Sequence, residues 1–149
     1  MKKSKRIIIV VAVLAVLFSG LNIFWYAYRE YRYNPLIENI PVNYGIRIVS
    51  IDGYSYSVTK PGYLEFKGNL SLTDEENPSG GLIIWPEFPK GYTVAVTLPD
   101  GETNVSVYID ADGNYLPEKN SKNKKEIYDA NYDTVIDLIT RANNMWELK

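Results

Sequence analysis

Cysteine and histidine are both absent from this sequence of 149 residues. Without a thiol or an imidazole, the chain cannot form a Cys-His or Ser-His-Asp nucleophilic site, and it cannot form a zinc site of Cys and His ligands. Disulfide bonds are excluded as well, so oxidation cannot stabilise an exported part of the chain. Carboxylate chemistry, Ser/Lys chemistry and non-covalent binding are the classes of function that remain.

Charge is missing from one long segment near the N-terminus, Ile7–Ala27. As a helix, these 21 residues would be about 31 Å long, close to the thickness of the hydrocarbon core of a bilayer. Thirteen of them are Ile, Val, Leu or Phe, and together they favour insertion by roughly 4–8 kcal/mol. We therefore predict a transmembrane helix at Ile7–Ala27 that contacts membrane lipid.

A cleaved secretory signal is the alternative interpretation of this run, because it begins with the same basic residues. The apolar core of such a signal is normally about 7–15 residues long and ends at a small-x-small site. No pair of small residues has that spacing near the end of this run, and Leu21 stands where a lipoprotein would carry its lipidated cysteine. The sequence favours a retained anchor, and either interpretation places the rest of the chain outside the cytoplasm.

The flanking charges predict the orientation of the helix. Four basic residues precede the run within residues 1–6, whereas only Arg29 and Arg32 follow it closely. Positive charge is retained on the cytoplasmic side, so the N-terminus is expected inside the cell membrane and the C-terminal part outside it. Aromatic side chains that suit the headgroup region cluster at the outer end of the run: Trp25, Tyr26, Tyr28, Tyr31 and Tyr33.

The part of the chain after the run is acidic. All 18 acidic residues and all but four of the 16 basic ones lie in it, which gives residues 29–149 a net charge of −6. This charge argues against a nucleic-acid partner. About 105 folded residues suffice for one domain with a single core. A composition rich in Lys, Asn, Ile and Tyr is typical of a bacterial protein.

The chain divides into a basic segment at 1–6, the transmembrane helix at 7–27, a juxtamembrane stalk at 28–42 and an extracytoplasmic domain at 43–149. Asn34-Pro35 is predicted to end the helix, because helical geometry is disfavoured before proline. From residue 44 the pattern has a period of two, with turn signals such as Asp52-Gly53. The predicted strands are 44–50, 54–58, 63–72, 82–85, 92–98 and 104–109.

Six to seven short strands with frequent turns predict a mainly β domain, a small antiparallel sandwich or a partly open barrel. The period changes near the C-terminus, where apolar residues from Tyr128 to Trp146 recur at spacings of three and four. Asp129, Asn131 and Asp133 supply a helix cap and negative charge at its start. We expect an amphipathic helix that packs on the sheet or over a barrel mouth.

A weak calcium candidate consists of Asp110, Asp112 and Asn114, whose oxygen-bearing side chains alternate as in a calcium loop. The segment departs from an EF-hand, because Gly113 stands at its fourth position and Ser121 at its twelfth. A hairpin turn accounts for the same residues. The sequence therefore leaves both interpretations open.

Trp85 and Phe88 are the candidate ligand-binding residues, as an aromatic platform for a sugar ring or a peptide. Pro86 and Pro89 are expected to force their segment out of the sheet. Aromatic residues at strand spacing also occur as core or cross-strand pairs, which is the alternative interpretation.

The predicted function is a non-enzymatic binding or scaffold role in a single-pass membrane protein of the bacterial cell envelope. Its partner would be a protein or another component of the envelope, and no catalytic residue or cofactor is predicted. A calcium- or carbohydrate-binding module is the alternative. A small carboxylate-dependent hydrolase is third, because such enzymes need only Asp and Glu.

Overall fold

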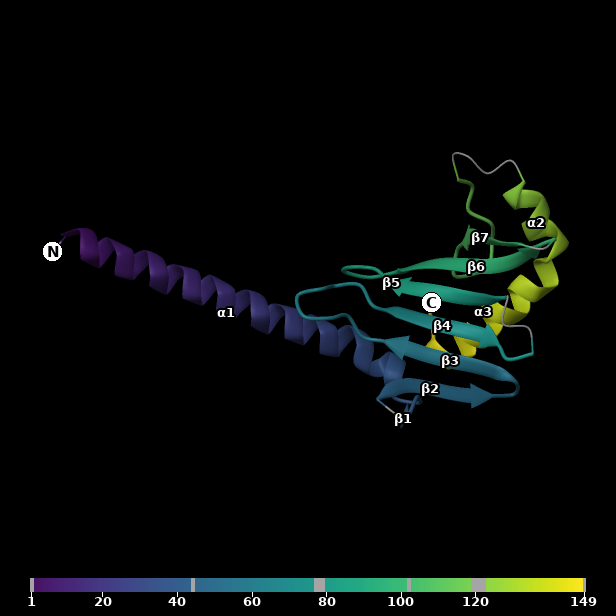
Figure 1. Cartoon of the computed structure of the whole chain (residues 1–149), viewed down its shortest axis with the longest axis horizontal. Coiled ribbons are helices and arrows are strands. Elements are labelled where there is room, and N and C mark those ends of the chain that lie inside the picture. The colour runs from purple at the N-terminus through teal and green to yellow at the C-terminus, as the bar shows by residue number, and fades with distance from the viewer. Residues whose placement is uncertain (1, 44, 77–79, 102, 119–122, 149) are drawn as a thin grey trace.

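One long helix leads into a sheet in the computed structural model, which describes residues 2–43, 45–76, 80–101, 103–118 and 123–148 (Figure 1). Helix α1 spans Lys2–Ile37, and its N-terminal half projects away from the rest of the molecule. The large apolar side chains from Ile7 to Leu21 are 46–71% exposed. By length and composition this helix can cross a membrane, which confirms the predicted N-terminal apolar helix.

In the described residues, seven strands form one open antiparallel sheet, in chain order from β1 to β7. The strands are β1 (Val42–Asn43), β2 (Ile46–Ile51), β3 (Tyr54–Thr59), β4 (Asn69–Asp74), β5 (Gly81–Pro86), β6 (Tyr92–Asp100) and β7 (Thr103–Ile109). Two helices follow, α2 (Lys124–Ala130) and α3 (Tyr132–Trp146). The predicted mainly β fold with a C-terminal helix is confirmed, although this helix is interrupted at Asn131.

One face of the sheet is apolar because side chains alternate along every strand. The register aligns these side chains into two rows across β3 to β7, and each of them is at most 4% exposed. The rows are Tyr56–Leu72–Leu82–Val96–Val107 and Val58–Leu70–Ile84–Val94–Ile109. Helix α3 packs on this face with its own buried side chains, Val135, Leu138, Ile139, Ala142 and Trp146.

The C-terminal end of α1 packs on the same apolar face. Three side chains from this end, and Ile40 just after it, are 0–8% exposed and belong to the core: Tyr33, Leu36, Ile37 and Ile40. The helix therefore does not end at Asn34-Pro35, as predicted, but continues through Pro35 to Ile37. A proline inside a helix costs about 3 kcal/mol, whereas burying each large apolar side chain contributes about 1.5–3 kcal/mol. Burial outweighs the cost, so most of the segment predicted as a stalk at 28–42 is helical.

The loop between β3 and β4 leaves the sheet to reach α1. The strand predicted at 63–72 begins only at Asn69, because Leu64 adopts a positive φ of 58° and interrupts the extended backbone. The buried N–H of Gly68 donates a hydrogen bond of 2.7 Å to the Tyr33 hydroxyl. A Cβ at Gly68 would lie 2.1 Å from the Thr59 carbonyl oxygen, so only glycine permits this approach.

Replacing Tyr33 by phenylalanine should lower the free energy of unfolding by about 1–3 kcal/mol, because the buried N–H of Gly68 would lose its acceptor. Tyr31→Phe is the matched control, since Tyr31 is 79% exposed on the same helix. Thermal unfolding of both variants in detergent micelles measures the effect. Equal midpoints for the two variants would contradict the assigned role of Tyr33.

Candidate functional site

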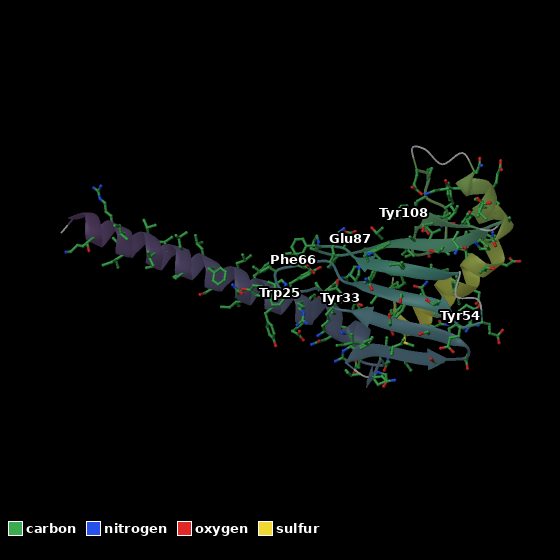
Figure 2. The ribbon with its side chains drawn as sticks, in the orientation of Figure 1. Trp25, Tyr33, Tyr54, Phe66, Glu87 and Tyr108 are labelled. Atoms are coloured by element: carbon green, nitrogen blue, oxygen red, sulfur yellow. The ribbon has the colours of Figure 1, made fainter. Side chains whose placement is uncertain are left out.

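The two aromatic residues predicted to form one ligand platform, Trp85 and Phe88, lie on different surfaces. Trp85 stays in β5, opposite Thr93, because Pro86 still pairs with Tyr92 as the last residue of the strand. Phe88 lies in the loop between β5 and β6, and its ring is 5.2 Å from that of Tyr28 in α1. Figure 2 shows Tyr108 on the sheet and Phe66 beside α1, on these two separate surfaces.

Trp85 lies half-buried on the sheet face opposite the core. A shallow pocket of about 210 Å³ there is lined by Trp85, Tyr108, Lys67, Glu87 and Thr93. The Glu87 carboxylate accepts hydrogen bonds from Lys67 Nζ at 3.0 Å and from Thr93 Oγ1 at 2.9 Å. These two hydrogen bonds hold the pKa of Glu87 below its usual range. The pocket thus joins two aromatic rings to a fixed carboxylate.

The sheet face around this pocket is the open face, which we define by the side chains opposite the core. Most of them are small and polar, and the register aligns them into two rows: Ser57–Ser71–Ile83–Ala95–Tyr108 and Ser55–Thr73–Gly81–Thr97–Ser106. Ile83 and Tyr108 are 39% and 38% exposed. In the described part of the chain, α1 and α3 pack against the other face, and Figure 1 shows α3 behind the strands.

Aromatic rings gather where α1 meets the sheet. We call Phe24, Trp25, Tyr28, Tyr63, Phe66 and Phe88 the aromatic collar. Its ring centroids are 5.2–6.2 Å apart, as in favourable tilted and edge-to-face pairs. The prediction that Tyr28 and Tyr33 face the headgroup region is wrong, because both are buried against protein. Tyr26 and Tyr31 remain 59% and 79% exposed.

Basic side chains of α1 fasten the two loops of the collar to the helix. Arg29 donates a hydrogen bond to the Pro61 carbonyl oxygen, and Arg32 donates one to the Gly91 carbonyl oxygen. The Arg32 guanidinium also lies 4.5 Å from the centroid of the Tyr92 ring, as in a cation–π contact. Both loops are therefore held at fixed positions along α1.

Sequence reasoning missed Tyr63 and Phe66 as members of the collar. Leu64 and Phe66 recur at the spacing of a strand, as do Leu70 and Leu72, and this pattern led to the predicted strand at 63–72. Pro61-Gly62 immediately before Tyr63 was the available signal of a loop. Contacts of this loop with α1, some 40 residues earlier in the chain, leave no local pattern in the sequence.

The calcium candidate residues form a closely bonded turn. One carboxylate oxygen of Asp110 accepts hydrogen bonds from the backbone N–H of Asp112 at 2.9 Å and of Asn114 at 2.8 Å. Its other oxygen accepts one from the side-chain amide of Asn114 at 3.0 Å. Asn114 thus presents its amide nitrogen to Asp110, whereas a calcium ligand would present oxygen. Ser121, the twelfth position of the compared EF-hand, lies outside the described residues.

This turn also positions the C-terminal helices. The Tyr128 hydroxyl of α2 donates a hydrogen bond of 2.7 Å to the Gly113 carbonyl oxygen.

Burial raises the pKa of Asp110, but the hydrogen bonds from Asn114 and from the backbone lower this pKa by more, so the net shift is downward. In the described residues, no three His, Cys, Asp or Glu side chains are grouped as metal ligands.

Comparisons with known proteins found no match. No protein-family model, no curated protein and no solved structure matches this chain.

Replacing Asp110 by alanine should lower the free energy of unfolding by about 1 kcal/mol at neutral pH, because the turn loses its carboxylate acceptor. The folded-state pKa lies below the unfolded value of about 3.9. The stabilisation is therefore present above that value and is lost as the pH falls through the folded-state pKa. The thermal midpoints of wild type and variant should differ at pH 7, and the difference should be smaller at about pH 3, below the unfolded-state pKa.

Asp100→Ala is the control for this comparison, because Asp100 is exposed at the turn between β6 and β7. An equal difference between wild type and Asp110→Ala at both pH values would contradict the carboxylate's role in the turn. Calcium that raised the midpoint of wild type but not of Asp110→Ala would instead support the metal-binding interpretation.

Proposed function

We propose that this protein is a single-pass membrane protein whose extracytoplasmic β domain binds a partner protein or another component of the cell envelope without catalysing a reaction. The observation that carries this proposal is the division of the sheet into one face covered by α1 and α3 and one open face. A sheet covered on one side only buries its core and leaves the other side available for contact.

The open face has the chemistry of a recognition surface. Its rows of Ser and Thr offer hydroxyl groups, and the exposed Ile83 and Tyr108 and the half-buried Trp85 add apolar area. Aromatic residues are enriched in protein interfaces because one rigid side chain supplies both apolar contact and a hydrogen-bonding group. This combination of hydroxyl groups and apolar side chains supports binding of a partner protein.

The anchor and its orientation have their own support. The basic residues before the apolar run favour an N-terminus in the cytoplasm. Retention of the helix is favoured because α1 is also part of the folded domain, through Tyr33, Leu36 and Ile37. Asn22 and Trp25, near the outer end of the run, likewise contact the β3–β4 loop.

A non-catalytic role is supported by the side chains that the chain possesses. It has no imidazole or thiol to act as a base or nucleophile near neutral pH. Glu30, Glu87 and Asp137 are already engaged by Lys60, Lys67 and Arg141 in ion pairs of 2.8–3.0 Å. A carboxylate-dependent hydrolase remains the third candidate.

A carbohydrate is the second candidate ligand, and the Trp85 pocket is the observation that favours it. Sugar rings bind to aromatic faces while their hydroxyls bond to carboxylates, and Trp85, Tyr108 and Glu87 line one pocket. Trp85→Ala should abolish binding of full-length protein to any glycan that an array identifies. Phe88→Ala is the matched control, because Phe88 lies outside this pocket.

The orientation can be tested with single cysteines, because the natural chain contains none. We expect a membrane-impermeant maleimide to label Thr140→Cys in intact cells, after removal of any outer layer, and Ser4→Cys only after the membrane is opened. Labelling of Ser4→Cys in intact cells would contradict the orientation. Loss of the Ser4→Cys site from the mature protein would show that the helix is cleaved.

The binding face can be tested with a photoreactive benzoylphenylalanine in place of one exposed tyrosine. At Tyr108, on the open face, it should give a discrete cross-linked product in membranes, and Thr97→Arg on the same face should abolish that product. Tyr132, which is 49% exposed at the start of α3, is the control position. Products from Tyr132 alone, or products that Thr97→Arg leaves unchanged, would contradict the proposal.

A further inference from the structure

The β3–β4 loop, residues 60–68, reaches far down α1 toward its N-terminus. The Tyr63 hydroxyl donates a hydrogen bond to Asn22 Oδ1, and Trp25 Nε1 donates one of 2.8 Å to the Glu65 carbonyl oxygen. The Trp25 and Tyr63 rings are in edge-to-face contact at 5.3 Å. Asn22 and Trp25 both belong to the apolar run Ile7–Ala27.

These contacts conflict with a simple division between a membrane helix and a domain standing clear of the bilayer. Asn22 lies five residues before Ala27, which is about 7.5 Å along a helix. If the bilayer ended below Asn22, only residues 7–21 would cross it, a length of about 22 Å against a hydrocarbon core of about 30 Å. The loop tip must therefore lie at the depth of the outer boundary of the bilayer.

The second loop of the collar, residues 87–91 between β5 and β6, approaches α1 at a similar level. The Phe88 ring lies 6.2 Å from that of Phe24, one residue before Trp25. Figure 1 shows both loops pointing toward the N-terminal end of α1, from the end of the sheet opposite α2. The two loop tips thus face the same side of the molecule as the apolar run.

The side chains on these tips suit the boundary between lipid and water. Tyr63 and Phe88 are 61% and 55% exposed, although both are aromatic. Amphipathic rings prefer the headgroup region, where one end is apolar and the other is hydrated. Lys90 is exposed beside Phe88 and can approach lipid phosphates, whereas Lys67 is paired with Glu87. An exposed aromatic group with a lysine beside it is what a bilayer surface would bind.

We propose that the tips of the two loops insert into the outer headgroup region of the bilayer that α1 spans. The inference rests on the proposed membrane anchor and adds a second and a third contact with the lipid. A domain held only by one helix could rotate about that helix. With both loop tips in the lipid, the same rotation would require the tips to leave the headgroup region. With three contacts the domain keeps one orientation, and its strands run away from the membrane surface.

Spin labels on single cysteines can test this proposal in the full-length protein. The protein is reconstituted into vesicles of phosphatidylcholine and phosphatidylglycerol, and each label reports its relative access to oxygen and to a water-soluble nickel chelate. Tyr63→Cys and Lys90→Cys place labels on the two tips. Val16→Cys marks the middle of the apolar run, and Asp100→Cys marks the exposed end of β6 far from both loops.

We expect an oxygen-to-nickel access ratio at Tyr63→Cys and Lys90→Cys that is several-fold higher than at Asp100→Cys. A lipid environment at Val16→Cys together with water access at both tips would overturn the insertion of the loops and leave the anchor standing. Water access at Val16→Cys would overturn the anchor, and the inference with it. Lys90→Cys leaves the aromatic collar intact, so its result does not depend on the Tyr63 contacts.

Discussion

Burial of the C-terminal end of α1 against the sheet is the interaction on which the rest of the structure depends. Tyr33, Leu36 and Ile37 are part of the same core as the two apolar rows of β3 to β7. The helix that is apolar enough to cross a membrane is thus also a structural element of the domain. Helix and sheet must move as one body, because any bend between them would expose this core to water.

The shared helix explains why the two faces of the sheet differ. A seven-stranded sheet needs cover over much of one face, and α3 alone is a helix of 15 residues, about 22 Å long. The end of α1 supplies further cover, because Tyr33, Leu36 and Ile37 belong to the same core and Tyr33 lies against Gly68. With the core complete on that side, the opposite face can be built from Ser, Thr and Ala, which need no covering layer.

Local periodicity predicted most of the fold but not the junction between helix and sheet. Alternation along β3 to β7 and the three-and-four spacing in α3 are properties of single elements, so the sequence predicts them directly. The same spacing occurs at Tyr33, Leu36, Ile37 and Ile40 and could have shown that the helix continues. Pro35 instead predicted the end of the helix, although burial of these side chains outweighs the free-energy cost of a proline inside a helix. The collar depends on contacts between segments that are distant in the sequence. Phe88 packs on Tyr28 of α1 in this collar, so it does not join Trp85 in the candidate site.

The position of the open face follows from the direction of α1. Because the strands and α1 run in broadly the same direction in Figure 1, a helix that crosses a bilayer sets the sheet upright on its surface. The open face then points sideways, close to the membrane, and Trp85 lies at the end of β5 from which the collar loop 87–91 leaves the sheet. A partner that approaches along the membrane surface would meet this face, whereas one from bulk solvent would first meet α2. In the proposed arrangement, the rigid junction at Tyr33 keeps the open face near the membrane. Binding to this face therefore favours partners that are themselves held at the membrane.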